Sequence, residues 1–472
     1  MDLHTLSIQE ASEGLTKKEF SSVELTKACL GQIKKTNPLI HANLTISEDK
    51  ALSQAKTADE ILKNGESNPL LGIPFTMKDT YCTEDIRTTA SSKILEHYIP
   101  VYSSEVYLRL RNKHAILLAK DNCDAWGHGA STENSDFGVT KNPWNLGYVV
   151  GGSSGGSAAV VTSDMAMFAI GEDTGGSIRQ PASFCNVVGL KVTYGRVSRF
   201  GAIAYASSLD SMGPIGKTVA DCAYILEAIA GKDQKDATSS PLTVDNYSSY
   251  LLKGVKGKRI GLPKEFFSEG IDAEVKTLVL AAAKKYAEMG ARVVETSLPS
   301  MKYAIAAYYL IAPSETSSNL ARYDGIRYGN PRSFFGDEAK RRIMIGTYAL
   351  SSGYYDQYYA KAQKIRTLIC QDFEDAFRNV DCLLAPVSPT TPFKIGEKSD
   401  DPLSMYLADA YTVPINLAGV PSLAMPCGFT KNNLPVGMQI VAPQFKEALL
   451  FQVGNAYEQV TEWHKRKPNL NY

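Results

Sequence analysis

Apolar side chains recur along this chain with two different periods, and the two periods predict alternating helices and strands. The N-terminal part has the helical period, with apolar residues four positions apart at Leu25, Cys29 and Ile33. Ser-x-x-Glu capping boxes that begin at Ser7 and Ser21 mark where two helices start. We expect the second helix to stop at Asn37-Pro38, because proline cannot continue the backbone hydrogen bonds of a helix.

Short apolar runs bounded by turn residues follow, and we interpret them as buried strands. These runs cover residues 71–77, 115–119, 165–170, 258–262 and 291–295. Between the last two, a helix is expected from Asp272 to Gly290, with an apolar face formed by Val275, Val279, Ala282 and Tyr286. Such a strand–helix–strand unit implies a sheet covered by helices. The stretches 232–249 and 386–402 are rich in polar residues or proline and are expected to be irregular.

Size and charge narrow the class of protein. The 472 residues, 44% of them apolar, can bury a large core, and a large α/β fold of that length can form one domain. The 50 basic and 50 acidic residues cancel, so the chain lacks the basic surface of a protein that grips nucleic acid unaided. The first residues lack the positively charged and apolar regions of a signal peptide. The chain also contains no run of about 18 apolar residues, so we expect no membrane-spanning helix. We therefore expect a cytoplasmic enzyme.

Metal chemistry is not expected. The 8 cysteines form no Cys-x-x-Cys pair, and the 6 histidines show no ligand spacing. We expect the cysteines to pack as small apolar side chains rather than to form a disulfide framework.

Two segments supply a base and a hydroxyl for nucleophilic chemistry. Lys78 directly follows the apolar run 71–77, and Ser153 lies in the glycine- and serine-rich run 151–157. A serine needs a base within hydrogen-bond reach, and a lysine can serve once its neighbours lower its pKa from about 10.4 toward neutrality. Apolar stretches flank the run 151–157, whereas a flexible linker is seldom placed between apolar stretches. The run also lacks the Gly-Lys-Ser/Thr ending of a phosphate-binding loop.

The most specific segment is Asp173-Thr-Gly-Gly-Ser177, which follows the expected strand 165–170 and opens toward a short helix. Ser177 is therefore expected at a sharp turn. The backbone N–H groups of Thr174, Gly175, Gly176 and Ser177 would be free there to hold an oxyanion.

With these segments in this order, the sequence resembles the amidase signature family, whose catalytic triad is Ser–Ser–Lys. The resemblance covers almost the whole chain and implies an α/β/α sandwich around a large mixed β-sheet. It implies one domain over residues 1–472, with the N-terminal helices (about 1–65) packed on the same core. It also implies that Ser177 is the nucleophile, that Lys78 is the terminal base and that Ser153, after a cis peptide bond, relays the proton.

Several longer segments resemble, within that family, the glutaminase subunits of tRNA-dependent amidotransferases. They are residues 130–135, 140–144, 189–198, 317–324, 340–356 and 412–421. This resemblance implies glutamine as substrate, with Arg342 on its α-carboxylate, Asp409 on its α-ammonium and Tyr308 or Tyr309 lining the pocket. It further implies a heterotrimer with B and C subunits that converts glutamyl-tRNA(Gln) to glutaminyl-tRNA(Gln). The partner would bind most of the tRNA and use ATP and Mg²⁺, and this chain would need no cofactor.

The sequence departs from the family pattern at two places. Cys123, Ala125 and Trp126 stand where the family more often has Met, Glu and Phe, and the segment 329–339 is shorter than in relatives.

Two other functions stay open on the sequence alone. A stand-alone amidase for small amides would share the triad but would not need Arg342 and Asp409. A catalytically silent scaffold protein is the second alternative, and the intact Lys78, Ser153 and Ser177 argue against it.

Overall fold

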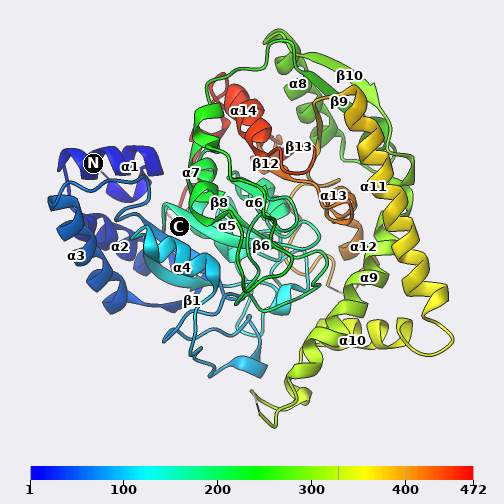
Figure 1. The fold of residues 1–472 in the computed structure, drawn as a ribbon, viewed down its shortest axis with the longest axis horizontal. Helices are drawn as coiled ribbons and strands as arrows, with labels where there is room; N and C mark the ends of the chain where they lie inside the picture. The colour runs from blue at the N-terminus through cyan, green and yellow to red at the C-terminus, as the bar shows by residue number, and fades with distance from the viewer. Residues whose placement is uncertain (1, 328, 400, 471–472) are drawn as a thin grey trace.

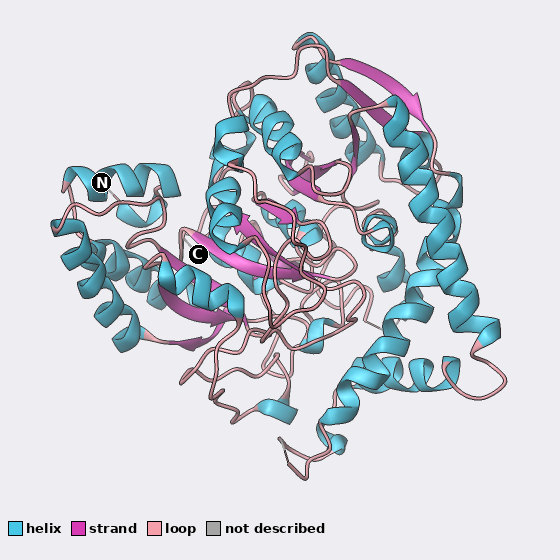
Figure 2. Cartoon of the chain, in the orientation of Figure 1, coloured by secondary structure: helices cyan, strands magenta, loops and turns pink. Residues whose placement is uncertain are grey.

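A mixed β-sheet of 11 strands forms the centre of the molecule in the computed structural model, which describes residues 2–327, 329–399 and 401–470 (Figures 1 and 2). The strands of the chain are β1 (Asn43–Ile46), β2 (Pro74–Lys78), β3 (Ile116–Asp121), β4 (Lys141–Asn142), β5 (Asn145–Val149), β6 (Phe168–Asp173), β7 (Val188–Lys191), β8 (Ser211–Gly216), β9 (Arg259–Pro263), β10 (Arg292–Thr296), β11 (Cys382–Pro386), β12 (Ser422–Phe429) and β13 (Pro435–Val441). Their order in the sheet is β1-β3-β2-β6-β8-β7-β12-β13-β11-β9-β10, and β4 and β5 form a separate pair. The sheet contains both parallel and antiparallel pairs, with β2, β3 and β6 parallel on one side and β9, β10 and β11 parallel on the other. The predicted large mixed sheet is confirmed.

Helices cover this sheet on both faces. They are α1 (Ile8–Lys17), α2 (Ser22–Ile40), α3 (Glu48–Lys63), α4 (Glu105–Asn112), α5 (Gly155–Thr162), α6 (Arg179–Cys185), α7 (Val219–Ile229), α8 (Ala273–Glu288), α9 (Ala304–Asn319), α10 (Asp337–Ala349), α11 (Lys361–Asn379), α12 (Pro402–Leu407), α13 (Val413–Ala418) and α14 (Glu447–Glu458). Gly213 and Gly216 lie three residues apart on β8 and so face opposite sides. A side chain at Gly213 would meet Ile178, beside α6, and one at Gly216 would meet Cys222 on α7. The two helices therefore lie on opposite faces, as in the predicted sandwich.

The first three helices lie at the β1 end of the sheet, and α8 and α11 lie near β9 and β10 at the other end (Figure 1). Buried residues of α1 and α2, among them Ile8, Leu25 and Ile33, belong to the same apolar cluster as Phe75 and Phe168 in the sheet. The N-terminal helices thus share the central core.

Both predicted capping boxes form at the N-termini of α1 and α2, with Glu10 and Glu24 completing them. The prediction that α2 stops at Asn37-Pro38 is wrong, because the helix includes Pro38 and continues to Ile40. The proline falls in the last turn, where it removes only one backbone donor. The N–H of His41 still bonds the carbonyl of Asn37 at 2.8 Å and closes the helix.

The predicted strands are present, with shifted ends. β2 begins after a turn in which Gly72 adopts a positive φ of 76°, and β6 begins after a turn at Asp164. The first apolar residues of the two predicted runs therefore lie in these turns and not in the strands. The helix expected from Asp272 is α8, and Asp272 caps it by accepting hydrogen bonds from Glu274 and Val275.

The neighbouring strands β2 and β6 are parallel, with Met77 opposite Ile170. Their carboxyl ends therefore meet at one edge of the sheet, which is where ligands bind in open α/β sheets. Lys78 ends β2, and the turn that carries Ser177 follows β6. Among the residues that the structure describes, no helix is long and apolar enough to cross a membrane.

Candidate active site

Lys78 is completely buried at the end of β2. Its Nζ lies 2.7 Å from Oγ of Ser153, within hydrogen-bond distance. The second polar group beside Nζ is the carboxyl group of Glu172, whose Oε2 lies 3.6 Å away. The sequence-predicted lysine and the first serine are therefore in direct contact.

Ser153 follows a cis peptide bond, and the preceding residue is Gly152. A side chain at Gly152 would lie 2.1 Å from Oδ2 of Asp124 and 2.6 Å from the backbone N of Ser131, so no larger residue fits. The next residue, Ser154, donates its backbone N–H to the carbonyl of Ser177 at 3.0 Å. The chain at Ser153 is in this way tied to the chain at Ser177, and the structure brings all three predicted residues to one place.

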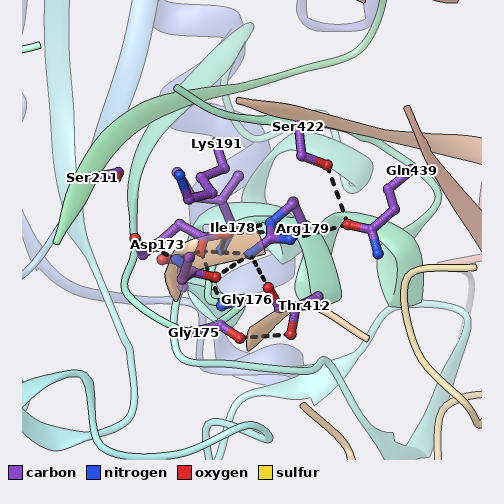
Figure 3. Close-up of polar contacts among 12 residues, drawn as sticks. Asp173, Gly175, Gly176, Ile178, Arg179, Lys191, Ser211, Thr412, Ser422 and Gln439 are labelled. Carbon is purple, nitrogen blue, oxygen red and sulfur yellow. Dashed lines mark hydrogen bonds and ion pairs between the residues drawn. The ribbon is translucent and has the colours of Figure 1, made fainter. Parts of the chain in front are cut away.

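The turn that carries Ser177 is fixed from inside by Asp173 and Arg179 (Figure 3). Asp173 accepts hydrogen bonds from the N–H groups of Gly176 and Ile178 at 2.9 and 3.2 Å, and from Nε of Arg179 at 3.0 Å. Burial disfavours the charge of Asp173, but the neighbouring Arg179 overcomes this and lowers the pKa to about 2. Arg179 is itself fully buried and donates to Gln439 at 3.0 Å. The turn is therefore tied to the sheet beneath it.

The predicted oxyanion site differs from expectation at Gly176. Its N–H is not free, because it donates to the carboxylate of Asp173. For Thr174, Gly175 and Ser177, no acceptor for the N–H is found among the described residues. A side chain at Gly175 would lie 2.5 Å from the hydroxyl of Tyr308, so the backbone approaches this tyrosine closely.

A cavity of about 130 Å³ lies beside Arg342. Its lining includes Tyr309, Glu338, Arg342, Lys398 and Tyr406.

Ser177 is buried except for 7% of its surface. The nucleophile of the predicted triad thus lies below the surface rather than on it.

Arg342 on α10 and Asp409, shortly before α13, are both buried beside the same tyrosine. The Tyr309 hydroxyl donates to Oδ2 of Asp409 at 3.0 Å, and the guanidinium of Arg342 lies 5.4 Å from the centre of the Tyr309 ring. Burial raises the pKa of Asp409 to about 7, against the opposing effects of Tyr309 and Arg342. A cation and an anion therefore bracket one tyrosine of the cavity wall. Of the two tyrosines that the sequence left open, Tyr309 lines this cavity and contacts Asp409, while Tyr308 lies beside Gly175 at the turn.

Several residues of the site were missed by sequence reasoning. Tyr205 accepts a hydrogen bond from Arg342 and packs against the ring of His128, whose centre lies 4.7 Å away. Burial lowers the pKa of His128 well below its ordinary value, so this histidine is neutral. Glu338 accepts from Nε of Arg342 at 2.7 Å. The spacing of Glu338 and Arg342, four residues on one helix, was the available signal.

Two of the residues that depart from the family pattern, Ala125 and Trp126, share an apolar cluster with Phe335 of the short segment. Trp126 is buried, and its ring lies 4.7 Å from that of Tyr323 and 5.5 Å from that of Phe335. Phe335 belongs to the segment predicted to be short. The large indole therefore fills the space beneath that segment.

Comparison with known proteins identifies the family of the chain. A family model described as amidase matches residues 24–451. The chain belongs to the amidase signature family. It is 54% identical to the A subunit of glutamyl-tRNA(Gln) amidotransferase from Caldanaerobacter subterraneus subsp. tengcongensis, over 97% of each chain. The corresponding protein of Thermoanaerobacter pseudethanolicus, which has the same name, is 53% identical over 99% of this chain and 98% of the relative.

Solved structures of this family have the same fold. The crystal structure of the A subunit of glutamyl-tRNA(Gln) amidotransferase from Thermotoga maritima is 39% identical, with a TM-score of 0.86 over 100% of this chain and 99% of that one. A native peptide amidase from Stenotrophomonas maltophilia is 29% identical, with a TM-score of 0.84 over 99% of each chain. As a member of the amidase signature family, the chain is an enzyme of the amidase class.

Proposed function

We propose that this chain is the glutamine-hydrolysing component of a glutamyl-tRNA(Gln) amidotransferase. The observation that carries the proposal is that a buried arginine, Arg342, and a buried aspartate, Asp409, contact the same residue, Tyr309. Free glutamine has an α-carboxylate and an α-ammonium, which need such a pair, whereas a simple amide does not. The similarity to named A subunits over nearly the whole chain supports the same choice.

The chemistry begins with proton transfer along the three central residues. The hydroxyl of Ser177 attacks the side-chain amide carbon of glutamine and gives its proton to Ser153. Ser153 in turn gives its proton to Nζ of Lys78, with which it is in contact at 2.7 Å. The oxyanion that forms is stabilised by backbone N–H groups, for which we propose those of Thr174, Gly175 and Ser177.

Collapse of this intermediate releases ammonia. The C–N bond breaks, and the proton held by Lys78 returns through Ser153 to the leaving nitrogen, so that NH₃ departs and an ester on Ser177 remains. Water then attacks the ester with the same residues as base, and glutamate leaves. The proton count on the enzyme is restored at the end of the cycle.

The substrate ends are held apart from this chemistry. Arg342 is positioned by Glu338 and Tyr205, and its guanidinium favours bidentate contact with a carboxylate. Asp409 receives the ammonium, and a bound cation there would favour the charged carboxylate. Tyr309 separates the two groups.

In the proposed reaction, the ammonia released at Ser177 is used at a second active site, on a partner subunit. We propose that B and C subunits complete a heterotrimer, that the tRNA is bound mainly through the partner, and that the ATP- and Mg²⁺-dependent activation of glutamate occurs there. This chain would contribute no cofactor to the reaction.

The test is glutamine hydrolysis by the purified chain and by its Ser177→Ala and Lys78→Ala variants. Both variants should lose hydrolysis, and to nearly equal extents, because residues that act as one unit are not additive. A fluorophosphonate probe should label Ser177 in the unmodified chain. Hydrolysis of a simple amide with no preference for glutamine would favour a stand-alone amidase. An unlabelled, inactive chain would favour a silent scaffold protein.

A further inference from the structure

A buried carboxyl group beside Lys78 has no place in the triad. Glu172 is only 1% exposed, and the polar side chains that face its carboxyl group are those of Lys78 and Thr80. Its Oε2 lies 3.6 Å from Nζ of Lys78, an ion-pair distance. A buried carboxyl group is costly unless it is paired, so the pairing of Glu172 with the proposed base needs an explanation.

The fold holds this carboxyl group where it is. Glu172 is the residue before the end of β6, and Lys78 is the last residue of the neighbouring parallel strand β2. The hydroxyl of Ser154 bridges to the backbone of Glu172, donating to its carbonyl at 3.1 Å and accepting from its N–H at 3.2 Å. Ser154 directly follows Ser153, so the same segment that presents Ser153 to Lys78 also fixes Glu172.

Charged and polar side chains face Glu172 from three parts of the chain. Lys78 faces it from β2, with Thr80 and Tyr81 just after that strand; Asp210 faces it from the residue before β8, and Arg199 from the loop before that. Burial raises the pKa of Glu172, and the charge of Lys78 opposes the increase. Burial and the charge of Glu172 together raise the pKa of Asp210 to about 8. Lys78 is thus the cation that directly opposes the charge of Glu172.

We propose that Glu172 is the charge partner of Lys78, holding the amine against Ser153 and setting the pH range in which that amine accepts a proton. This inference rests on the proposed function of Lys78 as the base. Glu172 touches no substrate atom and is a positioning residue rather than a catalytic one.

The expected sign follows from the charges. A carboxylate stabilises the ammonium form of a neighbouring amine, so the amine stays protonated, and inactive as a base, up to a higher pH than it otherwise would. The same carboxylate stabilises the ammonium that forms when Ser153 gives up its proton. Loss of the charge should therefore make the enzyme active at lower pH and less active on its plateau.

The experiment is the pH profile of kcat at saturating glutamine in the unmodified chain and in Glu172→Gln, because kcat/KM for glutamine would also follow the protonation of Asp409. The acid limb should move to lower pH by at least about one pH unit, since a charge within about 4–6 Å shifts a titration by about 1–3 units. The plateau of kcat should fall while KM stays unchanged, because Arg342 and Asp409 are untouched. Glu172→Ser also removes the charge and should move the acid limb in the same direction. It provides a second test if Glu172→Gln does not fold.

A matched control is Glu447→Gln. Glu447 is also completely buried, but its carboxyl group accepts from the N–H of Thr193 and faces Arg196 at 3.9 Å rather than Lys78. That variant has the same chemical change and should keep the acid limb of the unmodified chain. A purely structural effect of losing a buried carboxyl group would lower activity in both variants without moving either limb, and that result would overturn the inference.

The outcomes separate this inference from the proposed function. Glutamine hydrolysis that depends on Ser177, with an unmoved acid limb in both Glu172 variants, would overturn the inference and leave the function standing. If the chain does not hydrolyse glutamine, the rate of Ser177 labelling by a fluorophosphonate takes the place of turnover. A labelling profile that shifts to lower pH in Glu172→Gln would then support the inference while the function fails. Ser177 that is neither active nor labelled would overturn both.

Discussion

At the scale of single residues, the site depends on buried charged groups that contact other side chains. Arg179 is bonded to Asp173, Arg342 to Glu338, and Lys78 lies between Ser153 and Glu172. Breaking a buried pair by removing one partner costs about 3–5 kcal/mol, because the remaining charge is left uncompensated. Substitutions at such residues must therefore be judged against a substrate that does not use them.

Arg342→Gln and Asp409→Asn test the choice of substrate at this scale. Each should lower kcat/KM for glutamine by about 30- to 3,000-fold, since loss of one partner of a buried charge contact costs about 2–5 kcal/mol. An uncharged small amide should be hydrolysed almost as before, because Ser177, Ser153 and Lys78 are unchanged. Arg378→Gln, an exposed arginine on α11, is the control and should alter neither substrate. Equal losses on both substrates would show that the two residues support the fold or the triad.

The same pair predicts a pH dependence of binding. Burial raises the pKa of Asp409 to about 7, so its carboxyl group takes up a proton as the pH falls through that value. The protonated form cannot pair with the α-ammonium, and KM for glutamine should rise as the pH falls below this pKa. KM for the uncharged amide, measured over the same range, should not follow. A parallel rise for both substrates would point to a general change in the pocket.

Sequence reasoning at the residue scale found the groups with a chemical signature and missed those defined by packing. Lys78 directly follows an apolar run, and Ser153 and Ser177 stand in glycine-rich segments, so each has a recognisable context. Glu172 and Tyr205 have no such context, and their importance appears only when strands and loops that are distant in sequence are brought together. The free N–H expected at Gly176 was wrong because the carboxylate of Asp173, three residues earlier, turns back to accept it.

At the scale of elements, the turn between β6 and α6 is tightly constrained by its neighbours. A Cβ at Gly175 would lie 2.5 Å from the hydroxyl of Tyr308, and one at Gly176 would lie 2.3 Å from Oγ1 of Thr412. Gly176 also has a φ of +136°, which disfavours any side chain. The turn thus requires both glycines.

Gly175→Ala should therefore displace the turn while leaving the sheet intact. We expect kcat to fall by about 10²–10³-fold, the effect of losing one oxyanion donor, with little change in KM for glutamine. Gly31→Ala on α2 is a matched control, because nothing lies within 4 Å of its Cβ position and alanine favours a helix. Circular dichroism should show both variants folded. Unchanged kcat in Gly175→Ala would remove this turn from the proposed oxyanion site.

Element boundaries show where local sequence reasoning ends. Capping boxes located the starts of α1 and α2 because they are bonds within four residues. The predicted start of β2 and the predicted end of α2 were wrong. Whether the chain turns at Gly72, and whether Pro38 fits in the last turn of α2, depends on the residues that pack around them. Local pattern predicts that an element exists better than it predicts where the element ends.

At the scale of the whole molecule, the order of strands could not come from periodicity. β6 lies between β2 and β8, and β7 lies between β8 and β12, so neighbours in the sheet are often far apart in the chain. Hydrophobic pattern predicted a helix-covered sheet, and only the resemblance to a family implied the large mixed sandwich. That arrangement is what places the ends of β2 and β6 together and joins Lys78 to the Ser177 turn.

The last prediction concerns the proposed assembly, in which making ammonia and using it would be separate reactions. Combined with B and C subunits, ATP, Mg²⁺ and glutamyl-tRNA(Gln), the Ser177→Ala chain should fail to amidate the tRNA from glutamine but should do so from added ammonium. In the proposed reaction Ser177 acts only on the glutamine amide, whereas the activated glutamate on the partner would accept ammonia from any source. The measurement is the amount of glutaminyl-tRNA formed with each nitrogen donor, and the partners without this chain are the control. Amidation from glutamine that survived the substitution would show that Ser177 is not the nucleophile. Loss of amidation from ammonium as well would show that the substituted residue also matters for assembly or for the partner's reaction.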